Sequence, residues 1–278
     1  MSAEPDADED ARADADARSG RRNRGQRPAA LDVSGVTKSF SGLRALDGVT
    51  TTVEEGELVG VIGPNGAGKT TFFNCVSGVL EPDAGTVRLF GEDVTGAAPY
   101  EVARAGLVRT FQLTRELRTM TVEDNIRVAA PDHPGERTLH ALARTASMRE
   151  REAEVAARAD ELVERFELDH LRHEYSSNLS GGQRKLLELA RALMLDPSLL
   201  MLDEPFAGVN PTLTNDIADH IRSLNDEGLT VVVIEHELET LTELVDRLVV
   251  LANGSLLATG TPEEVLADER VIDAYLGG

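Results

Sequence analysis

Leu58–Thr71, which reads LVGVIGPNGAGKTT, decides how the rest of this chain is organised. It begins with the apolar, β-rich run LVGVI, turns through glycine-rich residues and continues into a helix-compatible segment. Gly63, Gly68, Lys69 and Thr70 fit the G-x-x-x-x-G-K-[ST] pattern (Walker A) of a phosphate-binding loop between a strand and a helix. The flanking pattern favours this interpretation over an ordinary glycine turn, so the sequence predicts a nucleotide site.

Each residue type in this loop has a chemical reason. Glycines let backbone N–H groups approach phosphate oxygens, and the helix N-terminus adds unpaired donors and the positive end of its dipole. The Lys69 ammonium is expected on the β- and γ-phosphates and the Thr70 hydroxyl on Mg²⁺. We therefore expect ATP and Mg²⁺ as cofactors. The expected nucleotide-binding residues are Gly63, Pro64, Asn65, Gly66, Ala67, Gly68, Lys69, Thr70 and Thr71.

The composition limits the possible partners and the habitat. The 278 residues suffice for one large domain or two modest ones, and the net charge of -21 argues against a nucleic-acid partner held by a basic surface. Acidic excess with only three lysines favours a halophilic protein, since high salt screens self-repulsion. A merely acidic mesophilic protein is the alternative. Cys75 is the only cysteine, so no intrachain disulfide forms, and we expect it in the core.

The apolar runs and the first residues of the chain predict a location inside the cell. No apolar run approaches the ~18 residues that span a bilayer, and the first residues lack the hydrophobic region of a signal peptide. Any membrane association is therefore expected through a partner. Residues 1–28 are rich in Ala, Asp and Arg and predict a disordered tail, with an electrostatic docking tail as the alternative. An ordered domain is expected over 29–278, with a helical insert at about 121–178.

Two carboxylates follow a strand that the sequence predicts to be buried. LLMLDEP at 199–205 places Asp203 at the carboxyl end of that strand, where ligands bind in open α/β sheets. Asp203 is expected to hold Mg²⁺, and Glu204 to orient or deprotonate the attacking water. The alternative is a pair of solvated carboxylates in an acidic protein. The apolar strand that leads straight into them favours the catalytic interpretation.

A second glycine-rich turn precedes another predicted helix. LSGGQ at 179–183 offers a serine hydroxyl and glycine N–H groups at a helix N-terminus, which again suits an anion. An ordinary glycine-rich cap is the alternative for this motif alone. The residues expected to contact nucleotide here are Ser180, Gly181, Gly182 and Gln183.

Two further side chains complete the predicted site. His236 follows the apolar strand TVVVIE, where an imidazole can bond a γ-phosphate oxygen, although a lone histidine is more often structural. The other histidines, including His170, His173 and His220, are interpreted as surface residues. Gln112 ends the run GLVRTFQ just before the helical insert, so it can touch the metal or the water and report on the insert.

In this order the motifs resemble those of the ATP-binding subunits of ABC transporters, and the resemblance covers about residues 31–278. It implies a P-loop α/β fold with a mixed or parallel core sheet, an N-terminal antiparallel β subdomain and an inserted all-helical subdomain. It also implies that Phe40 stacks on adenine. By the same resemblance, two such ATPase chains are expected to sandwich ATP between one phosphate loop and the other chain's LSGGQ. Gln112 and the insert are then expected to face the transmembrane permease subunits.

A narrower resemblance, to the Liv-type branched-chain amino-acid importers, rests on KSFSGLRAL, GLVRTFQ, EPFAGVNP, VIEHELE and the ending ATGTPEEVLADERVIDAYLGG. It implies an ATPase at the cytoplasmic face of the membrane, held there as a peripheral subunit. A heterodimer of two ATPase chains is expected, with a homodimer left open. The alternatives are a urea or amide importer and a soluble, non-transport ABC ATPase. Asn210 stands where the broader family has Asp. The contact that this Asp makes across the dimer in the broader family is therefore not expected to carry over unchanged.

Overall fold

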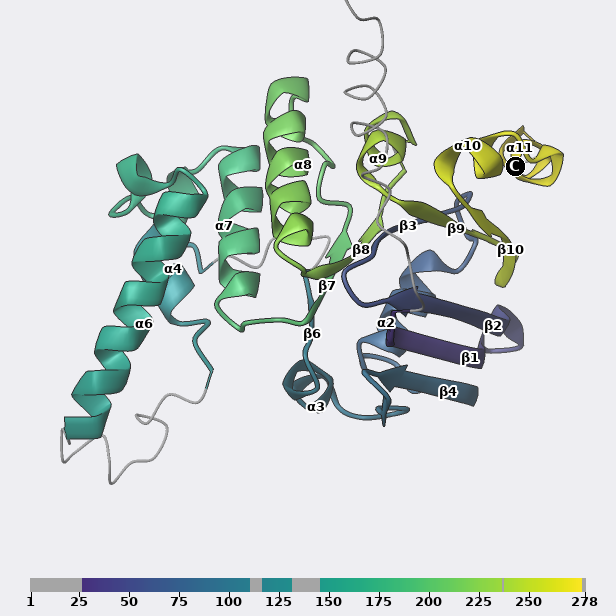
Figure 1. The fold of residues 1–278 in the computed structure, drawn as a ribbon, viewed down its shortest axis with the longest axis horizontal. Helices are drawn as coiled ribbons and strands as arrows, with labels where there is room; N and C mark the ends of the chain where they lie inside the picture. Colours follow the sequence, from purple (N-terminus) through teal and green to yellow (C-terminus); the bar gives the residue numbers. More distant parts are fainter. Residues whose placement is uncertain (1–26, 111–116, 132–145, 237, 277–278) are drawn as a thin grey trace, which may run out of the picture.

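The computed structural model describes residues 27–110, 117–131, 146–236 and 238–276. Its α/β fold combines a mixed six-stranded sheet, a four-stranded antiparallel sheet and helices packed against both (Figure 1). The predicted fold class is confirmed by this architecture. The predicted tail, residues 1–28, lies outside the described residues apart from Arg27 and Pro28.

The mixed sheet carries the ends of the strands that the sequence singled out. Its strand order is β10–β9–β3–β8–β7–β6, and all neighbours are parallel except β10, which runs antiparallel to β9. Every residue of β3, β7 and β8 is buried, which explains why these strands are continuously apolar rather than alternating. The strands are β3 (Leu58–Ile62), β6 (Leu107–Arg109), β7 (Leu199–Asp203), β8 (Thr230–Ile234), β9 (Arg247–Ala252) and β10 (Ser255–Gly260).

The antiparallel sheet has the order β2–β1–β4–β5 and lies beside the mixed sheet. Its long first two strands form a hairpin whose register shifts several times. These irregularities blur the alternation that a regular strand shows in its sequence. The strands are β1 (Ala29–Phe40), β2 (Leu43–Glu54), β4 (Ala84–Leu89) and β5 (Glu92–Asp93).

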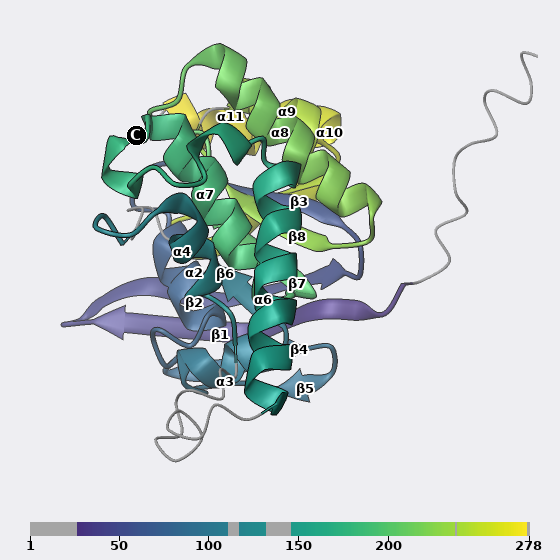
Figure 2. The same ribbon diagram turned by 90° about the vertical axis from the view of Figure 1, so that its left-hand side faces the viewer.

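The helices form two groups. Viewed from the side, α4, α6 and α7 stand next to one another in front of the sheets (Figure 2). Short helices α10 and α11 cover the far edge at β10 (Figure 1). The helices are α2 (Lys69–Val76), α3 (Pro99–Arg104), α4 (Val122–Arg127), α6 (Ala146–Arg165), α7 (Gly181–Leu193), α8 (Pro211–Asp226), α9 (Leu238–Leu244), α10 (Pro262–Leu266) and α11 (Glu269–Leu276).

Two apolar cores share the mixed sheet. Side chains alternate across a strand, so Val59 and Val61 of β3 enter the core beneath the antiparallel sheet, with Phe72 of α2. Leu58 and Ile62 enter the other core, which α6, α7 and α8 cover. This arrangement fixes the carboxyl ends of β3, β7 and β8 relative to the start of α2.

Local caps set the ends of several helices. Asn210 accepts a hydrogen bond from the Leu213 N–H, and Thr261 forms a capping box with Glu264. The helix after the phosphate loop ends at Val76. Gly78, with φ 72°, takes a left-handed conformation that terminates it.

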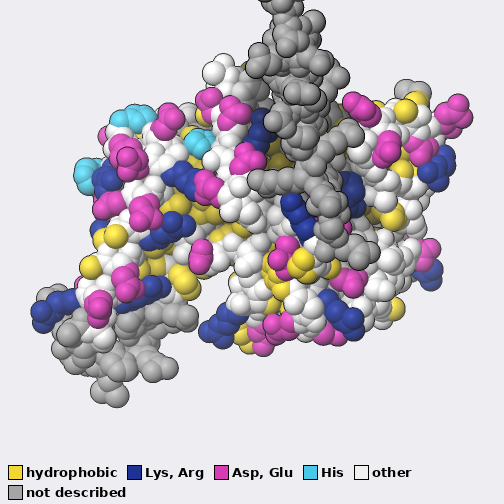
Figure 3. Space-filling model, in the orientation of Figure 1, with side chains coloured by type: hydrophobic (Ala, Val, Ile, Leu, Met, Phe, Trp, Pro, Cys, Tyr) yellow, Lys and Arg dark blue, Asp and Glu magenta, His cyan; other side chains and the backbone are white. Residues whose placement is uncertain are grey.

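The surface is rich in carboxylates. Asp and Glu side chains are spread over the face in Figure 3, interspersed with Lys and Arg. Along the described part of the chain, no helix has the length and apolar character that crossing a bilayer requires. The halophilic interpretation stays a prediction.

Candidate functional site

A pocket of about 450 Å³ lies over the glycine-rich loop, at the carboxyl edge of the mixed sheet. It brings together the loop after β3, the ends of β7 and β8, and the tip of the β1–β2 hairpin. Such an edge is where open α/β sheets bind ligands. The lining residues are Leu43, Arg44, Ala45, Asn65, Gly66, Ala67, Gly68, Lys69, Thr70, Thr71, Glu204, Ile234, His236, Asn253 and Gly254.

The loop holds its shape because glycines stand where a side chain would clash. A Cβ at Gly63, where φ is 153°, would lie 2.1 Å from the Leu251 carbonyl oxygen. One at Gly68, where φ is 100°, would lie 2.5 Å from the Ala45 carbonyl oxygen. Gly66, with φ 79°, faces open space. The backbone is thereby packed closely on its inner side and bare on its outer side, as a phosphate cradle requires.

The first turn of α2 presents donors to this pocket. Its N-cap is Gly68, and among the described residues no side chain accepts from the first N–H groups. No acidic side chain stands in that turn. The unpaired N–H groups and the positive end of the helix dipole therefore favour an anion.

Lys69 adds a positive charge to the cradle. Its ammonium donates to the carbonyl oxygens of Gly63 at 2.6 Å and Pro64 at 3.1 Å. Burial lowers the pKa of Lys69, and the negative charge of Glu204 opposes that shift. The ammonium thus sits folded over the loop, on the side from which phosphates would enter.

Glu204 and His236 line the same pocket and lie close together. Nε2 of His236 lies 3.0 Å from Oε1 of Glu204, although the two residues follow different strands. Glu204 has φ 51°, and its N–H donates to the Ile234 carbonyl at 2.9 Å. The structure therefore brings the predicted base and the predicted histidine together across from Lys69. A carboxylate next to an imidazole can accept a proton from water.

Asp203 directly precedes Glu204, and its carboxylate pairs with Arg109, a residue that the sequence did not single out. Its Oδ2 is 2.7 Å from Nη2 of Arg109, and both side chains are buried. The same guanidinium donates to Asn74 Oδ1 at 2.7 Å and to Ser77 Oγ at 3.1 Å. It also stacks over the Phe73 ring. Arg109 therefore joins β6, β7 and α2, and an arginine within the apolar run GLVRTF was the signal that could have revealed it.

Thr70 and Asp203 are the candidate ligands for a magnesium ion that the substrate would hold in part. In the ranges that the structure describes, no three His, Cys, Asp or Glu side chains come together as a metal site. Magnesium needs no such cage, since one or two protein oxygens and the phosphates of a nucleotide usually suffice. Thr70 lines the pocket beside Lys69, and Asp203 directly precedes Glu204.

The LSGGQ turn is built as a helix cap. Ser180 is the N-cap of α7, its Oγ accepts from the Gln183 N–H at 3.3 Å, and its own N–H donates to Gln183 Oε1 at 2.9 Å. Gly182 is required by packing, since a Cβ there would lie 1.7 Å from a Leu213 methyl group. The described lining of the phosphate-loop pocket includes none of the residues from Ser180 to Gln183.

Three predicted residues have other outcomes. Phe40 is 43% exposed at the end of β1, paired with Leu43, which lines the pocket, so its adenine contact stays a prediction. Gln112 lies outside the described residues. His220 is half-buried, with its ring centroid 5.0 Å from that of Phe166, and burial lowers the pKa of His220.

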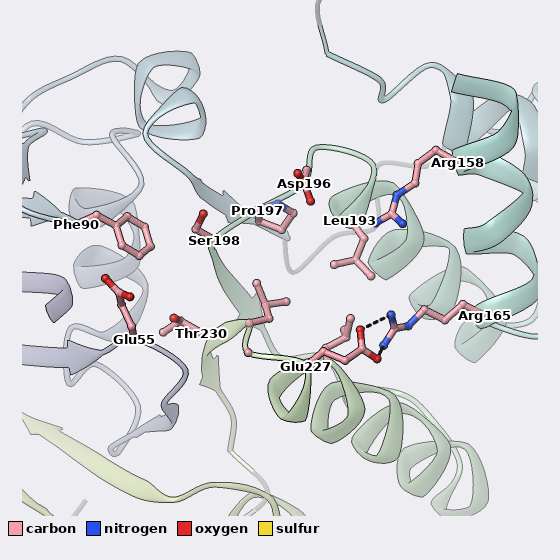
Figure 4. A pocket seen from close by; sticks show the side chains of 13 residues that line it. Glu55, Phe90, Arg158, Arg165, Leu193, Asp196, Pro197, Ser198, Glu227 and Thr230 are labelled. Atoms are coloured by element: carbon pink, nitrogen blue, oxygen red, sulfur yellow. Dashed lines mark hydrogen bonds and ion pairs between the residues drawn. The ribbon is translucent and has the colours of Figure 1, made fainter. Parts of the chain in front are cut away.

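A second cavity, of about 460 Å³, opens at the opposite edge of the mixed sheet (Figure 4). Its lining includes Ser198 and Thr230, at the amino ends of β7 and β8. There, Glu227 engages Arg165 through two bonds of 2.6 and 2.8 Å, which lowers the pKa of Glu227. This cavity is far from the phosphate loop along the strands, so it is not the nucleotide site.

Comparison with known families agrees with this geometry. Residues 46–207 match the ABC transporter family. This chain is a member of the ABC transporter family. Residues 255–278 also match a family described as branched-chain amino acid ATP-binding cassette transporter.

Curated relatives match this ABC ATPase over most of its length. It is 42% identical over 247 residues to a probable branched-chain amino acid transport ATP-binding protein, LivG, of Archaeoglobus fulgidus, covering 89% of this chain and 95% of the relative. It is 42% identical over 248 residues to a high-affinity branched-chain amino acid transport ATP-binding protein, BraF, of Pseudomonas aeruginosa, covering 89% and 97%.

Solved cassettes share the fold of this ABC ATPase. A nucleotide-free ATP-binding cassette from an ABC transporter superposes with a TM-score of 0.78 at 37% identity, covering 90% of this chain and 100% of the cassette. The ADP conformation of an ATP-binding cassette gives 0.77 at 36% identity, covering 90% and 99%. The protein is thus an ATP-binding and ATP-hydrolysing subunit of an ABC transporter, a class of ATPase that works as a dimer with membrane permeases.

Proposed function

We propose that this ABC ATPase energises an importer of branched-chain amino acids. Two relatives, LivG and BraF, are named for that transport, and its C-terminal residues 255–278 match a family described by it. The observation that carries the chemistry is the convergence of Lys69, Glu204 and His236 in one pocket. A urea or amide importer is the alternative substrate class.

The residues of the pocket divide the work of hydrolysis. The N–H groups of the loop and Lys69 would bind the β- and γ-phosphates. Glu204 would accept a proton from the attacking water, and His236 would hold Glu204 and bond the γ-phosphate. Thr70 and Asp203 would hold Mg²⁺, which when bound neutralises phosphate charge.

The assembly that we propose pairs this chain with a second ATPase chain. Ser180, Gly181, Gly182 and Gln183 would contact the ATP held by a second ATPase chain, which we take to be a different chain. Residues 29–278 would form the ATP-binding domain, with an insert at about 121–178. Gln112 and that insert would face the permease subunits, so the protein would be peripheral at the cytoplasmic face of the membrane.

Glu204→Gln tests the chemistry. The amide keeps the shape of the side chain but removes its basic oxygen, so hydrolysis should fall about 10²–10⁴-fold. Affinity for a fluorescent ATP analogue should stay within twofold, because the loop is untouched. Glu227→Gln, in the second cavity, is the matched control and should keep normal turnover. Wild-type turnover in Glu204→Gln would place the base elsewhere.

Uptake by a deletion strain tests the substrate class. Cells that lack this chain should lose uptake of labelled leucine, isoleucine and valine, and a plasmid copy should restore it. Uptake of labelled urea and of a basic amino acid serves as the control and should be unchanged. Loss of urea uptake alone would favour the alternative importer, and loss of neither would favour a non-transport ATPase.

A further inference from the structure

The chain uses lysine sparingly. Of 28 basic residues, only Lys38, Lys69 and Lys185 are lysines. Lys69 and Lys185 are both buried, and both donate to backbone carbonyl oxygens. An ammonium is a compact donor, whereas a guanidinium is a planar fork suited to carboxylates. In a chain that uses arginine almost everywhere else, the buried lysines mark places where a compact donor is required.

Lys185 contacts the backbone of the proposed catalytic base. Its Nζ donates to the carbonyl oxygen of Glu204 at 3.0 Å, and its side chain is 9% exposed. Lys185 also lines a small internal cavity together with Leu202 and Pro205, which flank the Asp203–Glu204 pair. The lysine therefore reaches the backbone of the proposed base from behind, not its carboxylate.

The backbone at this point needs support. Glu204 has φ 51°, a left-handed conformation that side-chain-bearing residues seldom adopt. Its N–H donates to the Ile234 carbonyl at 2.9 Å, and its carbonyl accepts from Lys185 Nζ at 3.0 Å and from the Ala207 N–H at 3.3 Å. With these backbone groups held, the side chain lies 3.0 Å from His236. Without Lys185, the carbonyl would lose its shorter, charged donor, and the left-handed turn that places the carboxylate would be held less firmly.

We propose that Lys185 is a positioning residue for hydrolysis, which holds the left-handed turn at Glu204 and so aims the carboxylate at the attacking water. This inference rests on the proposed role of Glu204. Lys185 belongs to α7, the helix that begins at the Ser180 turn. The helix proposed to contact the partner's ATP therefore also holds the base for this chain's own ATP.

A double-mutant cycle tests the proposal on the full chain. Lys185→Met keeps the apolar stem and removes the donor. Single-turnover hydrolysis of radiolabelled ATP should fall about tenfold or more, because small misplacements of a reacting group are costly. Affinity for a fluorescent ATP analogue should stay within twofold. In a Glu204→Gln background, Lys185→Met should cause no further loss, because the group it positions is already gone.

Two outcomes would overturn the inference. One is an equal loss of rate from Lys185→Met in both backgrounds, as a general structural role would give. The other is a wild-type rate in Lys185→Met while Glu204→Gln is inactive. If Glu204→Gln itself hydrolyses normally, the proposed function of Glu204 fails instead. Arg165→Met, which removes a basic group near the second cavity, is the control and should change the rate less than twofold.

Lys185→Arg gives a second measurement should Lys185→Met fail to fold. A guanidinium keeps the charge but cannot replace the compact donor in the same space. Its turnover should lie between those of the wild type and Lys185→Met, and its ATP affinity should be retained. If Lys185→Met cannot be obtained, the turnover of Lys185→Arg should still fall below that of the wild type. Full wild-type turnover in Lys185→Arg with the same ATP affinity would overturn the claim that a compact donor is needed.

Discussion

Two glycine-rich turns in this molecule look alike in sequence and differ in construction. Both lead into a helix N-terminus, α2 for the phosphate loop and α7 for LSGGQ. In the phosphate loop, Gly63, Gly66 and Gly68 have positive φ, whereas Gly181 and Gly182 are not among the residues with positive φ. The first turn uses glycine for backbone shape, and the second uses it to let α8 pack closely.

The two turns also differ in what their donors do. The first turn of α2 has no side-chain cap among the described residues, so its N–H groups remain for a ligand. Ser180 already accepts from one N–H of α7. The phosphate loop shares a pocket with Glu204 and His236, and the Ser180 turn does not. The proposed function therefore assigns the Ser180 turn to the ATP of a second chain.

The largest expected effect concerns the support beneath the phosphate loop. Arg109→Met would leave the buried carboxylate of Asp203 without its guanidinium, which typically costs about 3–5 kcal/mol in free energy of unfolding. Urea denaturation followed by circular dichroism measures it. Arg270→Met, which removes an exposed pair with Asp268, should leave the midpoint close to that of the wild type. Equal midpoints for both variants would show that Arg109 does not support the loop.

The second prediction compares ATP binding at the two turns. Lys69→Ala removes a charged donor from the pocket, worth about 1.5–3 kcal/mol, so affinity of the isolated chain should fall about 10–100-fold. Ser180→Ala should leave that affinity within twofold, although hydrolysis by the assembled transporter should fall. Titration with a fluorescent ATP analogue provides both values. A comparable loss of affinity in Ser180→Ala would mean that the LSGGQ turn contacts its own chain's nucleotide.

Sequence reasoning found the parts of this site that are local. The phosphate loop and the Asp203–Glu204 pair each depend on a few consecutive residues, and the structure brings the loop and Glu204 into one pocket. The contact from Arg109 to Asp203 joins residues 94 positions apart, so the arginine within GLVRTF could be noticed in the sequence but its partner could not.

The same limit explains the other differences. The contact that half-buries His220 comes from Phe166, which lies well before α8 in the chain and so could not be foreseen from the neighbours of His220 in sequence. Lys185 stands in a helix whose motif drew attention to its first residues only. Its partner, the Glu204 carbonyl, depends on a left-handed turn that the sequence does not encode through glycine.

The third prediction exchanges alanine for glycine at each turn. Gly63→Ala should lower the free energy of unfolding by about 1–3 kcal/mol or more, because of its φ of 153° and the 2.1 Å approach to the Leu251 carbonyl. Gly181→Ala should change it by less than about 0.5 kcal/mol, since its Cβ would lie 3.6 Å from the nearest atom. Thermal denaturation of both variants gives the comparison. Similar losses would show that the two glycines serve the same purpose.

The smallest effect uses Cys75 as a native probe of the phosphate-loop side. This thiol lies on α2, is 3% exposed, and burial raises its pKa from 9.0 to about 11. At pH 8 its thiolate fraction is about a hundredfold lower than that of an ordinary thiol, so a disulfide reagent should label it slowly. Saturating ATP should slow labelling further, because a ligand that binds only the native state opposes local opening.

The matched probe is the double variant Cys75→Ala, Ser177→Cys, which places a thiol at an exposed position beside the LSGGQ turn. It should label much faster than Cys75, and ATP should not change its rate in the isolated chain, because the described lining of the phosphate-loop pocket does not include the Ser180 turn. Protection by ATP at both positions would mean that one chain alone closes its nucleotide between the two turns. Protection at Cys75 alone is the outcome that the two constructions predict.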